Sequence, residues 1–216
     1  MNATNFFETS RDVLPASSES FWTSVFAFFL LHLADVPGRK IRGWKPCYSD
    51  NPPWFEVNPE IDFQVYGLTI YKLAVEPKSL DSMYRSLGQK LTGVSPDIVI
   101  QESPKSLLFI ENKIKTGAKL NSNQLSGYPS LIEALGKEGV AAQMVVLMSY
   151  GCSNKLFKQT QDLYKEKKLE AKFGVFLWED VFRQMTIVGS GVPGLEPQTL
   201  ESYWQEGKNL CRGWDV

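Results

Sequence analysis

The first strong hydrophobic pattern in the chain is helical and covers residues 17–34. Apolar side chains recur there at intervals of three and four residues, which places them on one face of a helix. Glu19 lies in the first turn, where the helix dipole favours a negative charge, and Pro37 with Gly38 ends the pattern. We therefore expect a helix with one buried stripe. The stripe comprises Trp22, Phe26, Phe29, Leu30 and Leu33, with Val25 at its edge.

The next part of the chain mixes irregular and strand-like segments. Residues 38–60 are rich in Pro, Asn and Trp, and their pattern predicts irregular structure. β-Branched and aromatic residues dominate 62–75, which favours strand structure with a turn or bulge at Gly67. Residues 76–95 are polar and have room for a short helix.

Two short apolar runs then predict a β-hairpin. They cover residues 97–100 and 106–114, and the turn-forming sequence Ser-Pro-Lys at 103–105 separates them. A helix follows within 122–137, where Pro129 either kinks the helix or opens its main part.

The remaining pattern alternates strands with helices. The order of all predicted elements indicates an α/β fold, with a central mixed β-sheet flanked by helices on both faces. A length of 216 residues corresponds to a single domain, residues 1–216, because domains average about 150 residues. The last thirty residues are expected to form an extension packed on that domain. The later predicted elements are a strand at 141–150, an amphipathic helix at 153–169, a strand at 173–178 and a short helix after it.

Composition excludes several kinds of chemistry. His32 is the single histidine, so no mechanism that needs two histidines is available. The three cysteines are scattered, without the spacing of a disulfide framework or a zinc site, which favours a reducing, cytoplasmic location. The 23 Lys and Arg residues balance 24 Asp and Glu residues, which excludes a polycation but leaves room for a basic face that binds nucleic acid. No apolar run is long enough to span a membrane, so no membrane partner is expected.

Charged residues interrupt the second strand of the predicted hairpin near its end. Strand alternation places Glu111 and Lys113 on the same face as Leu107 and Phe109. Charges among apolar side chains are costly unless they are paired or bind a metal ion. Antiparallel pairing brings Asp97, at the start of the first strand, beside the end of the second. We therefore expect two carboxylates and one ammonium group to meet.

Such a group can hydrolyse a phosphodiester without histidine. Two carboxylates can hold one Mg²⁺, which prefers oxygen ligands, lowers the pKa of a bound water and neutralises charge on a phosphate. Lys113 can position or deprotonate the attacking water, or stabilise the transition state. The alternative is that Glu111 and Lys113 form an ordinary solvated ion pair at a strand end.

These residues resemble a known motif. Ser95-Pro96-Asp97 and Glu111-Asn112-Lys113 are similar to the PD-(D/E)xK motif of the restriction-endonuclease-like nuclease superfamily, including the proline before the aspartate and the hairpin setting. Residues 123–128 resemble the Q-L-x-x-Y segment that often follows this motif, although Gly127 stands where a basic residue is common. The resemblance covers about residues 17–186, the expected nuclease-like core. It leaves 38–60 and the extension at 187–216 outside.

The resemblance implies site residues and a cofactor. Mg²⁺, with Mn²⁺ as a substitute, would be held by Asp97, Glu111 and the backbone carbonyl of Asn112. Many members carry a further glutamate on the first core helix, and Glu19 matches it. Gln124 would support the site, because the family's glutamine-bearing helix lies next to it.

The resemblance also implies a function and partners. It indicates a nuclease that cuts DNA by metal-activated water, in restriction, anti-phage defence or repair, and that acts as a homodimer or with a partner protein. A module of the same fold that binds nucleic acid or protein without catalysis is the alternative.

A basic cluster is the candidate nucleic-acid surface. Lys and Arg neutralise phosphates, and Trp can stack on a base. An ordinary solvated loop explains the same residues equally well. The cluster comprises Arg39, Lys40, Arg42 and Lys45 around Trp44, with Lys115 and Lys119 beside the motif.

Overall fold

The computed structural model of the chain describes residues 19–34, 41–44, 54–57, 63–65, 96–103, 105–114, 120–148, 154–169, 172–192 and 195–212. The helices are α2 (Glu19–Ala34), α4 (Ser122–Lys137), α5 (Asn154–Glu166), α6 (Trp178–Val188) and α7 (Pro197–Arg212). The strands are β1 (Ile41–Trp44), β2 (Trp54–Val57), β3 (Phe63–Val65), β4 (Ile98–Ser103), β5 (Ser106–Lys113), β6 (Ala141–Met148) and β7 (Phe173–Leu177).

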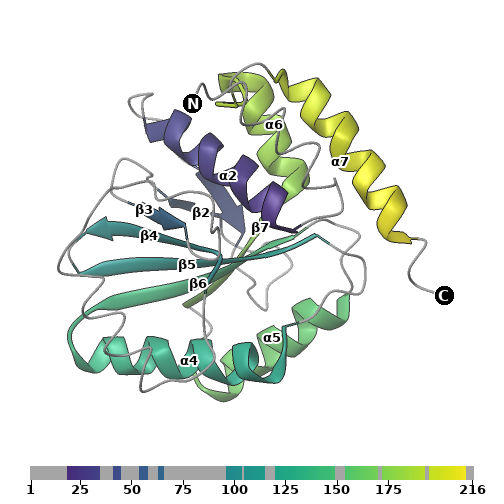
Figure 1. The fold of residues 1–216 in the computed structure, drawn as a ribbon. Helices are drawn as coiled ribbons and strands as arrows, with labels where there is room; N and C mark the ends of the chain where they lie inside the picture. Colours follow the sequence, from purple (N-terminus) through teal and green to yellow (C-terminus); the bar gives the residue numbers. More distant parts are fainter. Residues whose placement is uncertain are drawn as a thin grey trace.

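The strands of the described residues form one mixed sheet in the order β2-β1-β7-β6-β5-β4-β3. Its centre is parallel, from β5 through β6 to β7, and the strands on either side pair antiparallel. Helices α2, α6 and α7 cover one face, and α4 and α5 cover the other (Figure 1). The predicted α/β architecture, with a mixed sheet between two helical layers, is confirmed.

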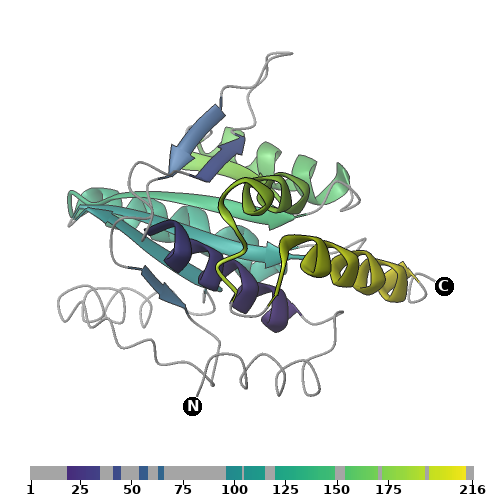
Figure 2. The ribbon, with the colours of Figure 1, turned by 90° about the horizontal axis from the view of Figure 1, so that it is seen from above.

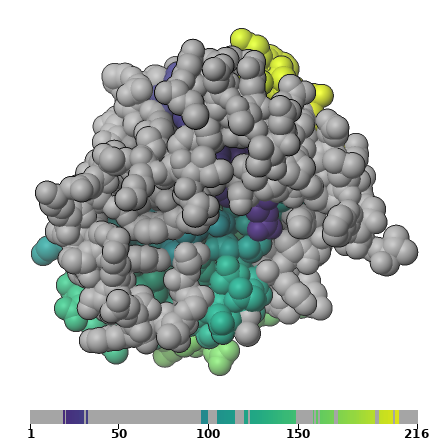
Figure 3. All heavy atoms as spheres, viewed as in Figure 1, coloured from purple at the N-terminus to yellow at the C-terminus, as the bar shows by residue number. Residues whose placement is uncertain are grey.

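Each face of the sheet has its own hydrophobic core. Leu108 and Ile110 of β5 belong to the core under α2, whereas Leu107 and Phe109 belong to the core under α4. The predicted alternation of β5 is therefore correct. The central strands are apolar on both faces, as expected for parallel strands covered by helices on both sides. Both outer layers reach the surface, with α7 at the top and α4 at the bottom of Figure 3.

Helix α2 is buried more widely than the predicted stripe. The stripe residues with described side chains are buried, and so are others around the helix, including Phe21, Ser24 and Ala27. The cause is that α6 and α7 pack beside α2 (Figure 2). Trp22 makes edge-to-face ring contacts with one residue of α6's first turn and one of α7, Trp178 and Trp204, at centroid distances of 5.5 and 4.8 Å.

The prediction that residues 38–60 are irregular is wrong at two places. β1 and β2 form there, pair with each other antiparallel and extend the sheet through Trp44, which is opposite Val175 of β7. Each strand has only four residues between Pro- and Asn-rich segments, which is too few to show an alternating pattern. Pairing of β1 with β7, which is distant in the sequence, stabilises them. Of the strand predicted over 62–75, β3 is described, and the rest lies outside the described residues, as does the helix predicted in 76–95.

The helix predicted over 122–137 forms as α4, with Pro129 in its interior rather than at its opening. Its N-terminus carries a capping box, in which Asn121 Oδ1 accepts from the Gln124 backbone N–H and Gln124 Oε1 accepts from the Asn121 N–H. This exchange fixes the first turn of α4.

The C-terminal extension contains a helix, α7, that the sequence pattern did not predict. Leu200 and Trp204 of α7 are each 1% exposed and belong to the core under α2. The sequence pattern was weak because Pro193 precedes the helix, Pro197 begins it, and few residues within it are apolar. Among the residues that the structure describes, no helix has both the length and the apolar character needed to cross a membrane.

Truncation of Leu200 tests whether α7 is part of the folded core. Leu200→Ala is expected to lower the free energy of unfolding by about 3 kcal/mol, because it leaves a cavity in a packed interior. Urea unfolding followed by tryptophan fluorescence measures the change. Glu201→Ala, at an exposed position of the same helix, is the control. Equal stability of the two variants would show that α7 contributes little to the fold.

Candidate functional site

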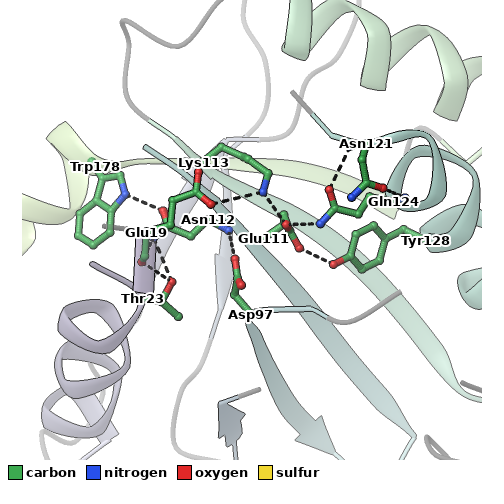
Figure 4. A network of polar contacts seen from close by, with 10 residues as sticks. All are labelled: Glu19, Thr23, Asp97, Glu111, Asn112, Lys113, Asn121, Gln124, Tyr128 and Trp178. Atoms are coloured by element: carbon green, nitrogen blue, oxygen red, sulfur yellow. Dashed lines mark hydrogen bonds and ion pairs between the residues drawn. The ribbon is translucent and has the colours of Figure 1, made fainter. Parts of the chain in front are cut away.

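The structure brings Asp97, Glu111 and Lys113 together at one end of the β4–β5 hairpin (Figure 4). Ile98 pairs with Ile110, so the next residues outward, Asp97 and Glu111, are neighbours. The Asn112 backbone N–H donates to Asp97 Oδ2 at 2.7 Å and fixes that carboxylate at the hairpin end. The register expected from antiparallel pairing thus places both carboxylates beside the lysine.

Glu111 is a buried carboxylate with protein donors on both oxygens. Its side chain lies in the layer between the sheet and α4, and the residue is 2% exposed. Lys113 Nζ and Gln124 Nε2 donate to Oε1 at 2.7 and 2.5 Å, and the Tyr128 hydroxyl donates to Oε2 at 2.5 Å. Because the capping box holds the other end of its amide, Gln124 connects the N-terminus of α4 to Glu111. A buried charge is stable only with partners of this kind.

Lys113 lies between two carboxylates of the site, those of Glu111 and Glu19. Its ammonium bonds Glu111 and lies 3.8 Å from Glu19 Oε2, so the side chain reaches from β5 to the first turn of α2. Burial lowers the pKa of Lys113, but attraction to Glu111 and then to Glu19 outweighs burial, and the net pKa lies above its usual value. Lys113 is therefore protonated at neutral pH in the metal-free protein.

Asp97 carries the least compensated charge of the site. Burial, followed by repulsion from Glu111, raises the pKa of Asp97 from 3.8 to about 7. The Asn112 N–H and the charge of Lys113 lower this pKa but do not cancel the increase. With Asp97 ionised, three carboxylates, Asp97, Glu111 and Glu19, face one ammonium among the described residues, so this group favours an additional positive charge.

Asn112 lies between the site residues but faces the opposite side of the sheet. Its amide is fully buried and bonds Thr23, the Glu19 backbone carbonyl and the Trp178 indole. Two helices that begin at this end of the sheet, α2 and α6, are thus bonded on this face to the strand that carries Glu111 and Lys113 (Figure 4).

The oxygen donors of the site suit a hard divalent cation. Carboxylates are the ligands that Mg²⁺ prefers, and Asp97 and Glu111 lie close enough for their repulsion to contribute, after burial, to the raised pKa of Asp97. Within the described ranges, no three His, Cys, Asp or Glu side chains are grouped closely enough to hold a metal by themselves. A cation at this site would therefore rely on Asp97 and Glu111, completed by backbone oxygen or water, and would compete with protein donors at Glu111 Oε1.

Four residues of the network were not predicted as site residues: Tyr128, Thr23, Trp178 and Asn121. Tyr128 follows Gln124 by four residues, so the two share a helix face, and this spacing could have identified it. Thr23 follows Glu19 by the same spacing. The contact of Trp178 with Asn112 joins residues 66 positions apart and has no local sequence signal.

The side chains predicted to contact nucleic acid lie outside the described part of the structure. Arg42 and Trp44 belong to β1, but their side chains are not among those described. Arg39, Lys40, Lys45, Lys115 and Lys119 lie outside the described residues. The basic surface thus stays a prediction.

No protein-family model, curated protein or solved structure matches this chain.

Removal of the Tyr128 hydroxyl tests how strongly the buried Glu111 carboxylate depends on its donors. Tyr128→Phe is expected to lower the free energy of unfolding of the metal-free protein by about 2 kcal/mol, because a hydrogen bond to a buried charge is lost. Tyr164→Phe is a matched control, since Tyr164 is equally buried but donates to the weak acceptor Met144 Sδ. Urea unfolding in EDTA measures both variants, and a loss in Tyr128→Phe no greater than in the control would contradict the expectation.

Proposed function

We propose that the protein is a Mg²⁺-dependent nuclease with a restriction-endonuclease-like core. The observation that carries the proposal is the meeting of Asp97, Glu111 and Lys113 at one end of a β-hairpin, where burial and the neighbouring Glu111 carboxylate raise the pKa of Asp97. The resemblance of the surrounding residues to the PD-(D/E)xK motif supports the same function. The mixed sheet between helical layers is compatible with that core.

Mg²⁺ fits the donor set, and Mn²⁺ is expected to replace it. Asp97 and Glu111 would hold the ion, with the Asn112 backbone carbonyl as a further ligand in the proposal and Glu19 close by. A bound ion of this kind supplies an acidified water and neutralises charge on the phosphate. The chain supplies the binding groups and excludes bulk water from Glu111, which is almost fully buried.

Lys113 is the proposed catalytic group. As a protonated amine beside the carboxylates, it can orient the attacking water and stabilise negative charge that develops on the phosphate oxygens. Gln124 and Tyr128 hold Glu111 in one orientation, and Glu19 helps to keep the ammonium in place. These residues position the reacting groups without contacting the phosphate.

DNA is the proposed substrate because most nucleases with this motif cut DNA. The basic residues around Trp44 and beside the motif are its proposed contacts. The proposed setting is restriction, anti-phage defence or repair, with a homodimer or a partner protein as the active assembly when both strands are cut.

Cleavage of supercoiled plasmid DNA tests the proposal. The protein is expected to nick or linearise the plasmid in Mg²⁺ and not in EDTA, and Glu111→Gln is expected to lower the rate at least about 100-fold. Glu133→Gln, at an exposed position of α4, is purified in parallel as the control for contaminating nucleases. Equal cutting by both variants, or equal cutting in Mg²⁺ and EDTA, would refute the mechanism.

The saturation of Glu111 by protein donors favours a second candidate. Lys113, Gln124 and Tyr128 satisfy this carboxylate without a metal ion, as in a module that keeps the fold for binding alone. Salt-sensitive binding of DNA without cleavage in Mg²⁺, Mn²⁺ or Ca²⁺ would favour this binding module over the nuclease.

A further inference from the structure

The buried side chain of Asn112 makes three hydrogen bonds to two helices, with both N–H donors and the carbonyl oxygen engaged. Its Nδ2 donates to Thr23 Oγ1 at 3.1 Å and to the Glu19 backbone carbonyl at 3.2 Å. Its Oδ1 accepts from the Trp178 indole N–H at 3.1 Å. The residue is 0% exposed and is surrounded by an apolar core, where a polar side chain is costly unless its partners are fixed.

Two residues of α2, Thr23 and Glu19, each bond the Asn112 side chain and also bond each other. Thr23 Oγ1 accepts from Asn112 and donates to the same Glu19 carbonyl at 2.9 Å. Two hydrogen bonds therefore tie the first turn of α2 to β5, and a third, within α2, links their two acceptors. Helix ends fray unless such contacts hold them, and Glu19 is the first residue of α2.

Two consecutive residues of β5, which point to opposite faces of the strand, both contact Glu19. Its backbone is bonded to Asn112 on one face of β5, while its carboxylate approaches the ammonium of the next residue, Lys113, at 3.8 Å. Glu19 also contributes, as the smallest of several causes, to the raised pKa of Asp97. The position of this carboxylate thus depends on where the first turn of α2 lies.

We propose that Asn112 is a positioning residue that holds the Glu19 carboxylate at the site through Thr23 and the first turn of α2. The catalytic consequence rests on the proposed nuclease function, whereas the structural consequence does not. Asn112 and Trp178 thereby connect α2 and α6, two helices of one layer, to the strand that carries Glu111 and Lys113. If Asn112 only filled space in the core, its replacement would not change the position of the Glu19 carboxylate.

Two sets of variants separate positioning from packing. Asn112→Leu combined with Trp178→Phe removes the amide and the indole N–H together, so that neither is left buried and unbonded. Thr23→Val removes only the bridging hydroxyl with almost no change of shape, and Thr23→Ser restores it. Thr160→Val, at an equally buried threonine of α5 on the other face of the sheet, is the matched control.

Hydrogen exchange of the metal-free protein tests the structural part. The amides of Thr23 and Ser24 are expected to exchange about tenfold faster in the Asn112→Leu/Trp178→Phe variant and in Thr23→Val, while Thr23→Ser and Thr160→Val match the wild type there. Unchanged exchange in the first turn of α2 would refute the proposal, whether or not the protein is a nuclease.

A mutant cycle with Glu19→Gln tests the positioning itself. Mn²⁺ binding, measured by the electron paramagnetic resonance signal of free Mn²⁺, is expected to weaken about tenfold in the Asn112→Leu/Trp178→Phe variant. In a Glu19→Gln background the same change is expected to weaken binding less than about twofold, because its effect passes through Glu19. If the Asn112→Leu/Trp178→Phe change weakens Mn²⁺ binding by the same factor in the wild-type and in the Glu19→Gln background, the two changes act independently and the proposal is overturned.

The two proposals fail in different ways. If the wild type neither binds Mn²⁺ nor cuts DNA, the nuclease function is refuted, and faster exchange in α2 would still support the tie between Asn112 and α2. If the wild type binds Mn²⁺ and cuts DNA but the cycle shows no coupling, Asn112 is a packing residue and the nuclease function stands.

Discussion

Replacement of Lys113 by methionine is expected to slow Mg²⁺-dependent DNA cleavage about 1000-fold, the scale typical of a lost catalytic proton-transfer or charge-stabilising group. Methionine keeps much of the length and apolar volume of the side chain but removes the ammonium. The loss should fall on kcat, because Lys113 is proposed to act on charge that develops in the transition state.

The same change should not weaken metal binding. The ammonium bonds Glu111 Oε1 at 2.7 Å and so occupies an oxygen that a cation would use. Its removal also leaves Asp97, Glu111 and Glu19 without their common positive partner. Mn²⁺ is therefore expected to bind Lys113→Met as tightly as the wild type or more tightly.

Single-turnover cleavage and Mn²⁺ titration measure these two effects, and circular dichroism checks that the variant folds. Lys105→Met, at the exposed turn of the same hairpin, is the control and should cut at the wild-type rate. A Lys113→Met protein that cuts normally would exclude the lysine from the chemistry. One that folds but has lost Mn²⁺ binding would show that the lysine supports the metal site instead.

The part of the site that the sequence predicted is the part set by local geometry. Strand alternation fixes the side on which Glu111 and Lys113 lie, and hairpin pairing fixes where Asp97 meets them. Both relations depend on a few consecutive residues and a short turn. The helix that brings Gln124 has an equally clear pattern, since a capping residue precedes it and an apolar face follows.

The rest depends on contacts between distant segments. Trp178 and Asn112 are 66 positions apart, and only the packing of α6 against β5 brings the indole to the amide. β1 and β2 are stabilised by pairing at the edge of the sheet, beyond β7, rather than by their own four-residue patterns. An asparagine within a buried strand is the one visible signal, because a polar residue at a core position must have a partner.

The buried charges also explain why this site should make the metal-free protein less stable. Glu111 has three donors, but Asp97 shares its surroundings with another carboxylate and has a pKa of about 7. Ionised Asp97 is therefore less favourable in the folded protein than in the unfolded chain. The ionised form of Asp97, which the proposed cation would need, therefore lowers the free energy of unfolding of the metal-free protein.

Replacement of Asp97 by asparagine is accordingly expected to abolish cleavage, by about 1000-fold or more, and to stabilise the metal-free protein at pH 8. The amide oxygen of asparagine can still accept from the Asn112 N–H, so the hairpin contact is kept. The folded pKa of Asp97 lies above its unfolded value of 3.8, so the folded state binds more protons between those values. Wild-type stability should therefore fall as pH rises from about 4 to about 7, and the advantage of Asp97→Asn should grow over the same range.

Urea unfolding of both proteins in EDTA at pH 5 and pH 8 measures this difference. Added Mg²⁺ should raise the stability of the wild type at pH 8 and not that of Asp97→Asn, because a ligand stabilises only the state that binds it. Asp180→Asn is the control, since Asp180 forms an ion pair with Arg183 in α6. A wild type that is more stable than Asp97→Asn at pH 8 in EDTA would show that the Asp97 charge is already compensated. The site would then have no need of a cation.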